Sequence, residues 1–338
     1  MNAGLRGLVV VGIVMVAAGC DNVKWGGVHL GLWEPSDSFG EEITPLFTSD
    51  TVVTTVAEEP LGSVLYLGRR SGSQASLIPV AEIRLDGLYP LEGMGSPEES
   101  RKFTAKHLTV GSEFMLFSAG SRVGRLSAVN FGVDERYCQP RPQIRGPIEL
   151  IPDASTVQTF LALPSHLGKT FDYRNYAPVI QTRNLRVVSL TAMQSIIPSV
   201  GALWPPSVLG IRKDIQVFRI NPKEAPTVVA TFVNEDSIIV GQAPRDAYSV
   251  FLMASDPDGS GYRTTYTDYR LARRDGKGVA RYVDHLDVDQ DGSPEIVLEV
   301  MGENFMWLSA LSRRGEAMTE TYWDPCGLPA PVGVTRRP

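Results

Sequence analysis

Short apolar runs separated by turn residues dominate the chain from about residue 43 onward. "GSVLYLGRR" and "LIPVAEIRL" flank the turn "SGSQAS", and "SEFMLFSAGSRVGRLSAV" is typical of a hairpin that turns near Gly120. From about Asp214, eight further runs follow one another, from "IQVFRI" through "SIIVG" to "FMWLSALS". Connections this short force antiparallel neighbours. We therefore expect a mainly β fold of antiparallel meanders, closed as a sandwich, a barrel or a partial propeller, with a few short helices.

Three segments have helical features. "SPEESRKFTAKHL" begins with Ser96, Pro97 and two acidic residues, which is typical of a helix start. "DASTVQTFLAL" is a candidate for a short helix capped by Asp153 or Ser155. "SLTAMQSII" is a further candidate, which Pro198 would end.

These patterns divide the chain into five parts. We expect a signal peptide at 1–19, a Gly-rich tether at 20–45 and an N-terminal β domain at 46–150. A helical or linker segment follows at 151–210, and a second β domain occupies 211–338. This length is sufficient for two domains with cores of their own.

The first twenty residues have the layout of a secretory signal. "MNAGLRGLVVVGIVMVAAGC" combines Arg6 near its start, an apolar run from Leu8 to Val16 and small residues before Cys20. The apolar run is too short to span a bilayer as a helix. Ala17-Ala18-Gly19-Cys20 resembles the lipobox of bacterial lipoproteins, which implies cleavage before Cys20 and lipidation of its sulfur. The alternative is an ordinary signal peptide whose cleavage site happens to precede a cysteine.

Lipidation would place the protein on a cell membrane, facing the periplasm or the cell exterior. Each buried methylene contributes about 0.8 kcal/mol, so several acyl chains anchor a protein stably. Removal of residues 1–19 takes away Arg6 and leaves 31 basic and 38 acidic residues, a net charge of −7. A mildly acidic chain without a basic block is a poor ligand for nucleic acid, so we expect no nucleic-acid partner.

Two cysteines remain once Cys20 is lipidated. Cys138 lies in "ERYCQPRP" and Cys326 in "WDPCGLPAP", both beside proline in turn-like surroundings. An oxidising compartment favours a disulfide between them, which would fasten the C-terminal tail to the middle of the chain. Two separate free thiols are the alternative.

The stretch "VDHLDVDQDGSPEIVLEV" concentrates negative charge in one short loop. Asp287, Asp289 and Asp291 fall on alternate residues, followed by Gly292 and then Glu295. Carboxylates this close repel one another unless a cation neutralises them, and Ca²⁺ prefers several hard oxygens from a flexible loop. Gly292 permits the sharp turn that the loop requires. A solvated Asp-Gly hairpin turn is the alternative interpretation.

The spacing of the acids matches the first half of an EF-hand loop but not the second. Leu298 stands where an EF-hand has its bidentate Glu, and the following "EIVLEV" predicts a strand rather than a helix. Acids followed by a strand resemble instead the calcium loop of integrin-type propeller repeats, the FG-GAP or VCBS class, near residues 283–307. The resemblance implies a structural calcium site. Its ligands would be the side chains of Asp287, Asp289, Asp291 and Glu295, and the main-chain oxygen of Ser293.

A weaker version of this pattern occurs in "DPDGSGYRT". Asp256, Asp258 and Ser260 have the right spacing, but Thr264 stands where the closing acid would be. We interpret this stretch as a plain hairpin turn, with a second cation site as the alternative.

No local pattern predicts catalysis. The chain has no G-x-S-x-G elbow, and its four histidines form no closely spaced pair that would hold zinc. His285, beside Asp284, is either a general base or, as we favour, a residue that orients the acidic loop. We therefore expect a non-enzymatic binding or scaffold module with a protein or glycan partner. The alternative is a periplasmic hydrolase, possibly acting on glycans, with an acid pair assembled from distant strands.

Overall fold

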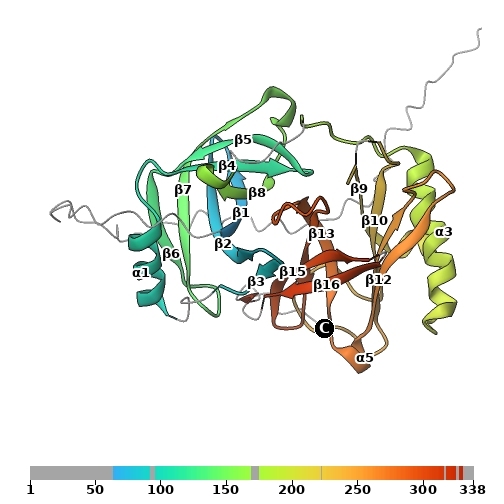
Figure 1. Cartoon of the computed structure of the whole chain (residues 1–338). Coiled ribbons are helices and arrows are strands. Elements are labelled where there is room, and N and C mark those ends of the chain that lie inside the picture. The colour runs from blue at the N-terminus through green and yellow to red at the C-terminus, as the bar shows by residue number, and fades with distance from the viewer. Residues whose placement is uncertain are drawn as a thin grey trace, which may run out of the picture. The chain divides into compact units, whose positions relative to one another are not determined.

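The protein is described from a computed structural model, which covers residues 64–91, 96–168, 175–221, 223–315, 317–324 and 327–329. Figure 1 follows its elements along the chain. The predicted signal peptide, Cys20, the tether and Cys326 lie outside the described residues. The prediction of a mainly β fold built from antiparallel sheets is confirmed. Among the described residues, no helix has both the length and the apolar character needed to cross a membrane.

The first eight strands form one sheet that closes on itself. Strand pairing runs from β1 to β2, β7, β5, β4 and β8, and β8 pairs with β1 again, so six strands complete an antiparallel ring. The short strands β3 and β6 extend this barrel from β2 and β7. The bounds are β1 Val64–Ser71, β2 Gln74–Arg84, β3 Gly87–Tyr89, β4 Glu113–Ser118, β5 Ser121–Ser127, β6 Asn130–Asp134, β7 Arg141–Leu150 and β8 Thr159–Pro164.

Strands β1, β4 and β8 are apolar on both faces because each face meets a different core. In β1, Tyr66 belongs to the core inside the barrel, while its neighbours Leu65 and Leu67 pack on the outer face. Since successive side chains of a strand point to opposite faces, a strand buried on both sides needs a continuous apolar run. "FLAL" in β8 is such a run, and all four of its residues are buried.

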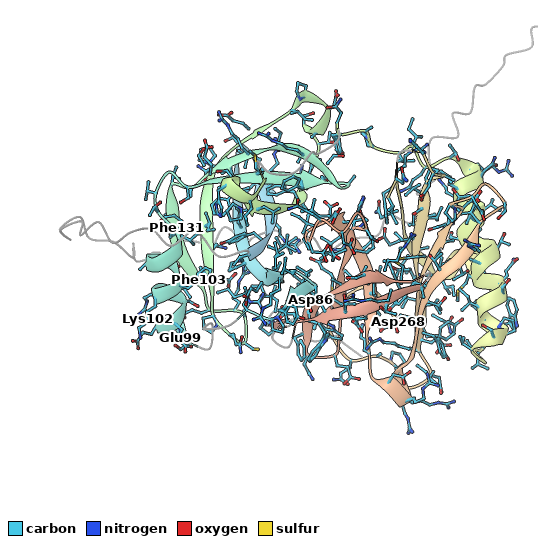
Figure 2. All side chains as sticks on the ribbon, in the orientation of Figure 1. Asp86, Glu99, Lys102, Phe103, Phe131 and Asp268 are labelled. Carbon is cyan, nitrogen blue, oxygen red and sulfur yellow. The ribbon has the colours of Figure 1, made fainter. Side chains whose placement is uncertain are left out.

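Helix α1 (Pro97–His107) packs against β6 and β7 of the barrel. Its predicted start is confirmed, because the Ser96 side chain caps the backbone N–H of Glu99 at 3.2 Å. Phe103 packs against the core cluster that contains Phe131, while Glu99 and Lys102 lie on the exposed side of the helix (Figure 2).

The C-terminal part of the chain forms two further antiparallel sheets. One has the order β12-β11-β10-β9, and the other has the order β13-β14-β15-β16 with β17 added beside β15. The bounds are β9 Arg212–Phe218, β10 Thr227–Asn234, β11 Tyr248–Ser255, β12 Arg263–Leu271, β13 Val279–Leu286, β14 Glu295–Met301, β15 Phe305–Arg314, β16 Ala317–Trp323 and β17 Leu328–Pro329.

These sheets are stacked through shared cores. The outer face of the barrel shares a cluster with the β13–β16 sheet that includes Met115, Val297 and Leu308. The opposite face of that sheet packs on the β9–β12 sheet, where Phe251 meets Leu298. The far face of the β9–β12 sheet is covered by α3 (Arg183–Ser199). The remaining short helices are η1 Pro152–Ala154, α2 Ser165–Gly168, α4 Val208–Ile211 and α5 Ala272–Asp275.

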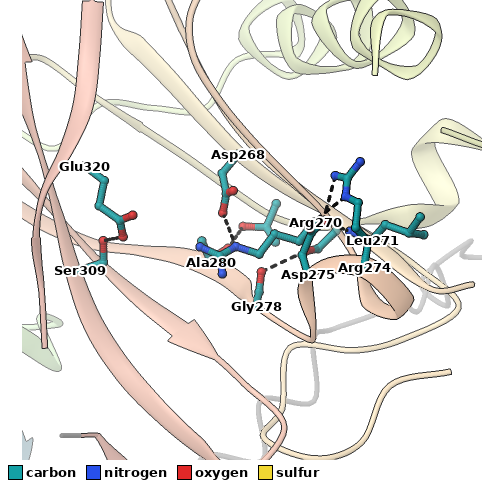
Figure 3. A network of polar contacts seen from close by, with 11 residues as sticks. Asp268, Arg270, Leu271, Arg274, Asp275, Gly278, Ala280, Ser309 and Glu320 are labelled. Atoms are coloured by element: carbon teal, nitrogen blue, oxygen red, sulfur yellow. Dashed lines mark hydrogen bonds and ion pairs between the residues drawn. The ribbon is translucent and has the colours of Figure 1, made fainter. Parts of the chain in front are cut away.

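Polar contacts join the two stacked C-terminal sheets beside their common core (Figure 3). Thr231 Oγ1 donates to the carbonyl of Ala280 at 2.7 Å, and Ser249 Oγ donates to the carbonyl of Gly278 at 3.0 Å. Both acceptors lie on or next to β13, which forms the edge of its sheet. These bonds therefore satisfy backbone groups that β14, on the other side of β13, cannot reach.

Two sequence-based predictions of local structure are wrong. "DASTVQTFLAL" forms the single turn η1 and then β8, not a helix, because β8 pairs with both β1 and β4, and Leu161 and Ala162 have partners on both strands. β8 thus joins the barrel from inside the segment predicted as helical or linking. "SIIVG" at 237–241 is not a strand; the Gly241 N–H donates to the carbonyl of Gly302 at 3.1 Å, and Val240 packs against the core beside the barrel.

Candidate functional site

The acidic loop connects β13 to β14, two paired strands of one sheet. Leu286 is the last residue of β13 and Glu295 the first of β14, and both are buried. Two residues between them have positive φ, Gln290 at 62° and Gly292 at 88°. Gly292 adopts a positive φ without strain, as expected from the sequence. Residues with a side chain seldom adopt a positive φ, so the conformation of Gln290 needs support from the rest of the loop.

That support comes from the aspartates themselves. Asp287 Oδ2 accepts the N–H of Gly292 at 3.0 Å, and Asp289 Oδ1 accepts the N–H of Asp291 at 3.3 Å. Asp291 Oδ1 accepts the N–H of Ser293 at 2.7 Å. These bonds hold the loop in a coiled form, and the second oxygen of Asp287 has no hydrogen-bond partner among the described residues.

Asp287, Asp289 and Asp291 converge as the sequence predicts. Each offers an oxygen atom, and these three atoms lie within 4.8 Å of one another. No second group of three such residues occurs in the part of the chain that the structure describes. Two unit charges 4 Å apart repel by about 1 kcal/mol in water and by about 4 kcal/mol at a dielectric constant of about 20. Gathering three carboxylates is therefore costly unless a cation or protons reduce their charge.

Burial adds to this cost. Removal from water, followed by the charge of Asp291, raises the pKa of Asp287, and burial is also the main reason that the pKa of Asp289 is raised. Asp287 Oδ1 is buried and has no hydrogen-bond partner among the described residues. A buried acceptor without a partner fits a cation ligand, because coordination would satisfy it.

Glu295 occupies a different position from the three aspartates. Its carboxylate accepts the N–H of Val288 on Oε2 at 3.1 Å and the hydroxyl of Ser312 on Oε1 at 3.2 Å. Burial raises its pKa to about 7. The side chain therefore closes the base of the loop, and it stands outside the group of converging oxygens. The Ser293 N–H is bonded to Asp291, and its carbonyl stays a predicted ligand.

A pocket of about 970 Å³ borders the acidic loop. Five separate segments line it, namely 118–121, 156–159, 175–181, 216–220 and 282–294, the last containing β13 residues and the acidic loop. Its volume lies at the upper end of the range of about 300–1,000 Å³ for small-molecule sites. The pocket thus joins the barrel to both C-terminal sheets.

A compact polar cluster lies at one wall of this pocket. Asp284 Oδ1 accepts the N–H groups of Ala119 at 2.7 Å and of His285 at 2.8 Å. Tyr282 shares a hydrogen bond of 2.7 Å with His285 Nδ1, and the His285 ring stacks on Phe218 with ring centroids 4.4 Å apart. Burial raises the pKa of Asp284 to about 7, and the donated N–H bonds only partly offset it.

The turn between β4 and β5 closes directly over His285. A Cβ atom at Gly120 would lie 2.8 Å from His285 Nε2, and Gly120 has a φ of 66°. Glycine is therefore required there both by the close approach and by the backbone conformation. His285 is thus packed between the barrel turn and Phe218, as expected of a residue that positions its surroundings.

Sequence reasoning did not find the pocket. Its lining residues come from five segments between Ser118 and Pro294, and apolar, polar and charged side chains are mixed among them. The local signals were His285 beside Asp284 and the acidic loop, which forms part of the pocket wall. Cys138 lies where its N–H donates to the carbonyl of Gly327 at 3.4 Å, next to the predicted partner Cys326, which the structure does not describe.

The chain stands apart in comparisons with known proteins. No protein-family model matches it, and neither a curated protein nor a solved structure proved similar to it.

Proposed function

We propose that this protein is a membrane-anchored extracytoplasmic lipoprotein, that it acts as a non-enzymatic binding module, and that the pocket beside the acidic loop is its ligand site. The observation that carries this proposal is the concave pocket of about 970 Å³, which is lined by both polar and apolar side chains. Side chains from all three sheets or their connections meet there, and such junctions are common places for ligands. The acidic loop serves as a structural calcium site at the rim.

Photo-crosslinking tests the binding function without assuming a ligand. A diazirine amino acid placed at Gln216, in the pocket wall, should form a specific adduct when the protein is expressed in its native envelope. The same probe at Leu85, which is 99% exposed and outside the pocket lining, is the matched control. Identical products at both positions, or none at either, would contradict a ligand site in this pocket.

The anchor rests on Cys20, in the segment outside the described residues. The variant Cys20→Ser should move the protein from the membrane fraction to the soluble fraction, because no acyl chain can be attached. Continued fractionation with the membrane would show that the anchor lies elsewhere.

A calcium ion in the loop would be held by Asp287, Asp289 and Asp291. The unpartnered Oδ1 of Asp287 and the raised pKa values of Asp287 and Asp289 support this assignment. The ion would cancel the repulsion among the three carboxylates and hold the β13–β14 connection. Extracytoplasmic sites as weak as about 10⁻⁴ to 10⁻³ M are sufficient for such a role.

We also propose the disulfide between Cys138 and Cys326. The backbone N–H of Cys138 is bonded to the carbonyl of Gly327, which follows Cys326 in the chain. This hydrogen bond supports the disulfide because it places the neighbour of Cys326 beside Cys138. Mass spectrometry of non-reduced peptides should find the two cysteines joined. Two alkylatable thiols in the native protein would refute the bridge.

A hydrolase is the second candidate, favoured by one observation. Asp284 lines the pocket, and burial raises its pKa to about 7, which suits a general acid or base near neutral pH. Against this role, its carboxylate is 2% exposed and accepts two backbone N–H groups. Turnover of a saccharide substrate that is lost in Asp284→Asn would favour the hydrolase over the binding module.

A further inference from the structure

The acidic loop is itself part of the pocket wall. Asp287, Gln290, Gly292 and Pro294 all line the cavity. Any change in the loop conformation therefore changes the shape of the pocket. Asp287 belongs both to the wall of the pocket and to the group of converging aspartates, so an ion and a ligand would contact the same short segment.

The charges of the wall restrict the ligand. Asp284 and Asp287 contribute carboxylates, and Arg219 is the only lysine or arginine of the described lining. The Arg219 guanidinium already donates to the carbonyl of Glu224 at 2.6 Å. An anionic ligand would meet Asp284, one engaged cation and the acidic loop, whose three carboxylates keep a net charge of −1 with a divalent ion bound, so phosphorylated or sulfated molecules are disfavoured.

The hydrogen-bonding groups of the wall are mostly neutral amides and hydroxyls. Three glutamines of the wall donate hydrogen bonds through their Nε2 atoms. Gln158 donates to the carbonyl of Thr156 at 3.3 Å, and Gln181 donates to the carbonyl of Ile215 at 2.9 Å. Gln216 donates to Asp214 Oδ1 at 3.2 Å. In each side chain the amide oxygen and a second N–H are left for a ligand.

Fixed amides that can both donate and accept match hydroxyl groups, which do the same. Because Gln181 and Gln216 are held by part-buried hydrogen bonds, ordering these two side chains on binding would cost little additional entropy. A purely apolar ligand would leave these groups unpaired and is therefore disfavoured. Tyr176, half-buried in the same wall, adds an aromatic side chain with apolar area.

We propose that the pocket binds a neutral oligosaccharide through these amides, and that cation binding by the acidic loop strengthens this binding. The proposal rests on the proposed function of the pocket as a ligand site. The coupling follows from linkage, since an ion that stabilises the loop conformation of the bound state raises the affinity for the saccharide. By reciprocity, the saccharide raises the affinity for the ion by the same factor.

Calorimetric titration of the full chain with hexasaccharides tests the proposal. The probes are neutral hexamers of glucose in α-1,4, β-1,4 and β-1,3 linkage, and hexamers of mannose, xylose and N-acetylglucosamine. At least one should bind in the presence of 5 mM Ca²⁺, and excess chelator should weaken that binding at least 3-fold. Heparin-derived hexasaccharide, which is sulfated, should not bind. Failure of every neutral probe overturns the proposal.

Two substitutions locate the binding. Gln158→Ala and Gln216→Ala should each weaken the binding of the hexasaccharide by about 2- to 10-fold, as expected for loss of one hydrogen bond. Gln194→Ala, at an exposed position of α3 outside the pocket lining, is the matched control and should leave the affinity unchanged. Unchanged affinity in both pocket variants places the saccharide elsewhere and overturns the proposal.

The ligand site and its assignment to saccharides can be rejected separately. Specific crosslinking from Gln216 without binding of any neutral hexasaccharide would preserve the ligand site and reject its assignment to saccharides. A crosslinked product identified as a peptide would have the same meaning, with the edge strand β9 as the place where an extended chain could pair. Absence of both crosslinking and saccharide binding would reject the ligand site itself.

Discussion

The loops at 256–261 and 287–292 contain the same hydrogen bond from a glycine N–H to an aspartate, but they differ in charge. In each, the N–H of a glycine returns to the first aspartate of the loop, from Gly261 to Asp256 at 3.1 Å and from Gly292 to Asp287 at 3.0 Å. Only the second loop gathers three carboxylates. In the first, the position of the third acid is taken by Ser260, whose hydroxyl donates to Asp258 at 2.7 Å.

The pKa values of the aspartates are also shifted in opposite directions in the two loops. The hydrogen bonds from Ser260 lower the pKa of Asp258, which is exposed. Burial raises the pKa of Asp287 and of Asp289, and no basic side chain among the described residues is paired with either. A loop can therefore have the residue spacing of a calcium site although hydrogen-bond donors of the same loop already stabilise its carboxylates. From this difference we expect a countercharge at 287–292 and none at 256–261.

The largest expected effect concerns Asp324, a buried carboxylate whose charge is balanced by an arginine of the protein. Asp324 accepts two bonds from Arg141, at 2.8 and 2.9 Å, and both side chains are buried. Asp324→Ala would leave the arginine charge uncompensated and should lower the free energy of unfolding by about 3–5 kcal/mol. Urea unfolding should give this loss equally with calcium and with chelator.

An exposed ion pair provides the control for that measurement. Glu149 is paired with Arg125 at 2.7 Å, and its side chain is 70% exposed. Glu149→Ala should lower the free energy of unfolding by less than about 1 kcal/mol. A loss in Asp324→Ala no larger than in Glu149→Ala would contradict the role of burial.

Asp284 should make the calcium-free protein less stable as the pH rises. Burial raises its pKa from 3.8 to about 7, so the folded protein keeps a proton that the unfolded chain has already released. Stability attributable to this group falls between about pH 4 and pH 7 and is constant above, with a total of at most about 4 kcal/mol.

The matched variant removes this titration. Asp284→Asn keeps an oxygen that can accept the N–H groups of Ala119 and His285. Chemical unfolding in chelator at several pH values should show a weaker decline in the variant than in the wild type. Parallel curves would mean that Asp284 titrates normally in the folded protein.

Removal of calcium should have an effect of intermediate size. An ion at 100 times its dissociation constant stabilises the folded protein by about 2.7 kcal/mol, which is on the order of 5–10 °C in melting temperature. Chelator should lower the melting temperature of the wild type by this amount, whereas Asp289→Ala should no longer respond. Equal melting of the wild type with and without chelator would remove the structural role of calcium.

The smallest effect is expected at the other loop. Asp258 is exposed and bonded only within its own turn. Asp258→Ala should leave the melting temperature close to that of the wild type and should keep the full response to chelator. Loss of that response would assign the calcium effect to residues 256–261 and would invert the comparison.

The features that sequence revealed are those set by neighbouring residues. The cap of α1 at Ser96, the β4–β5 hairpin at Gly120 and the convergence of the three aspartates all depend on local spacing. β8 was missed because its central role comes from pairing with β1 and β4, which lie far away in the sequence. The apolar "SIIVG" lacks such a partner strand, so propensity alone gave a wrong prediction there.

The pocket was hidden for the same reason. Gln158, Gln181 and Gln216 come from three segments that only the closed barrel and the stacked sheets bring together. The position of Glu295 was also not fixed by spacing. Its partner Ser312 lies on β15, two strands away from β13, and this contact directs the carboxylate toward the base of the loop.

Equilibrium dialysis of the full chain against ⁴⁵Ca²⁺ tests the central claim most directly. We expect one bound ion per wild-type molecule, one per Asp258→Ala molecule and none per Asp289→Ala molecule. Absence of bound ion in the wild type, or an ion that Asp289→Ala retains and Asp258→Ala loses, would contradict it.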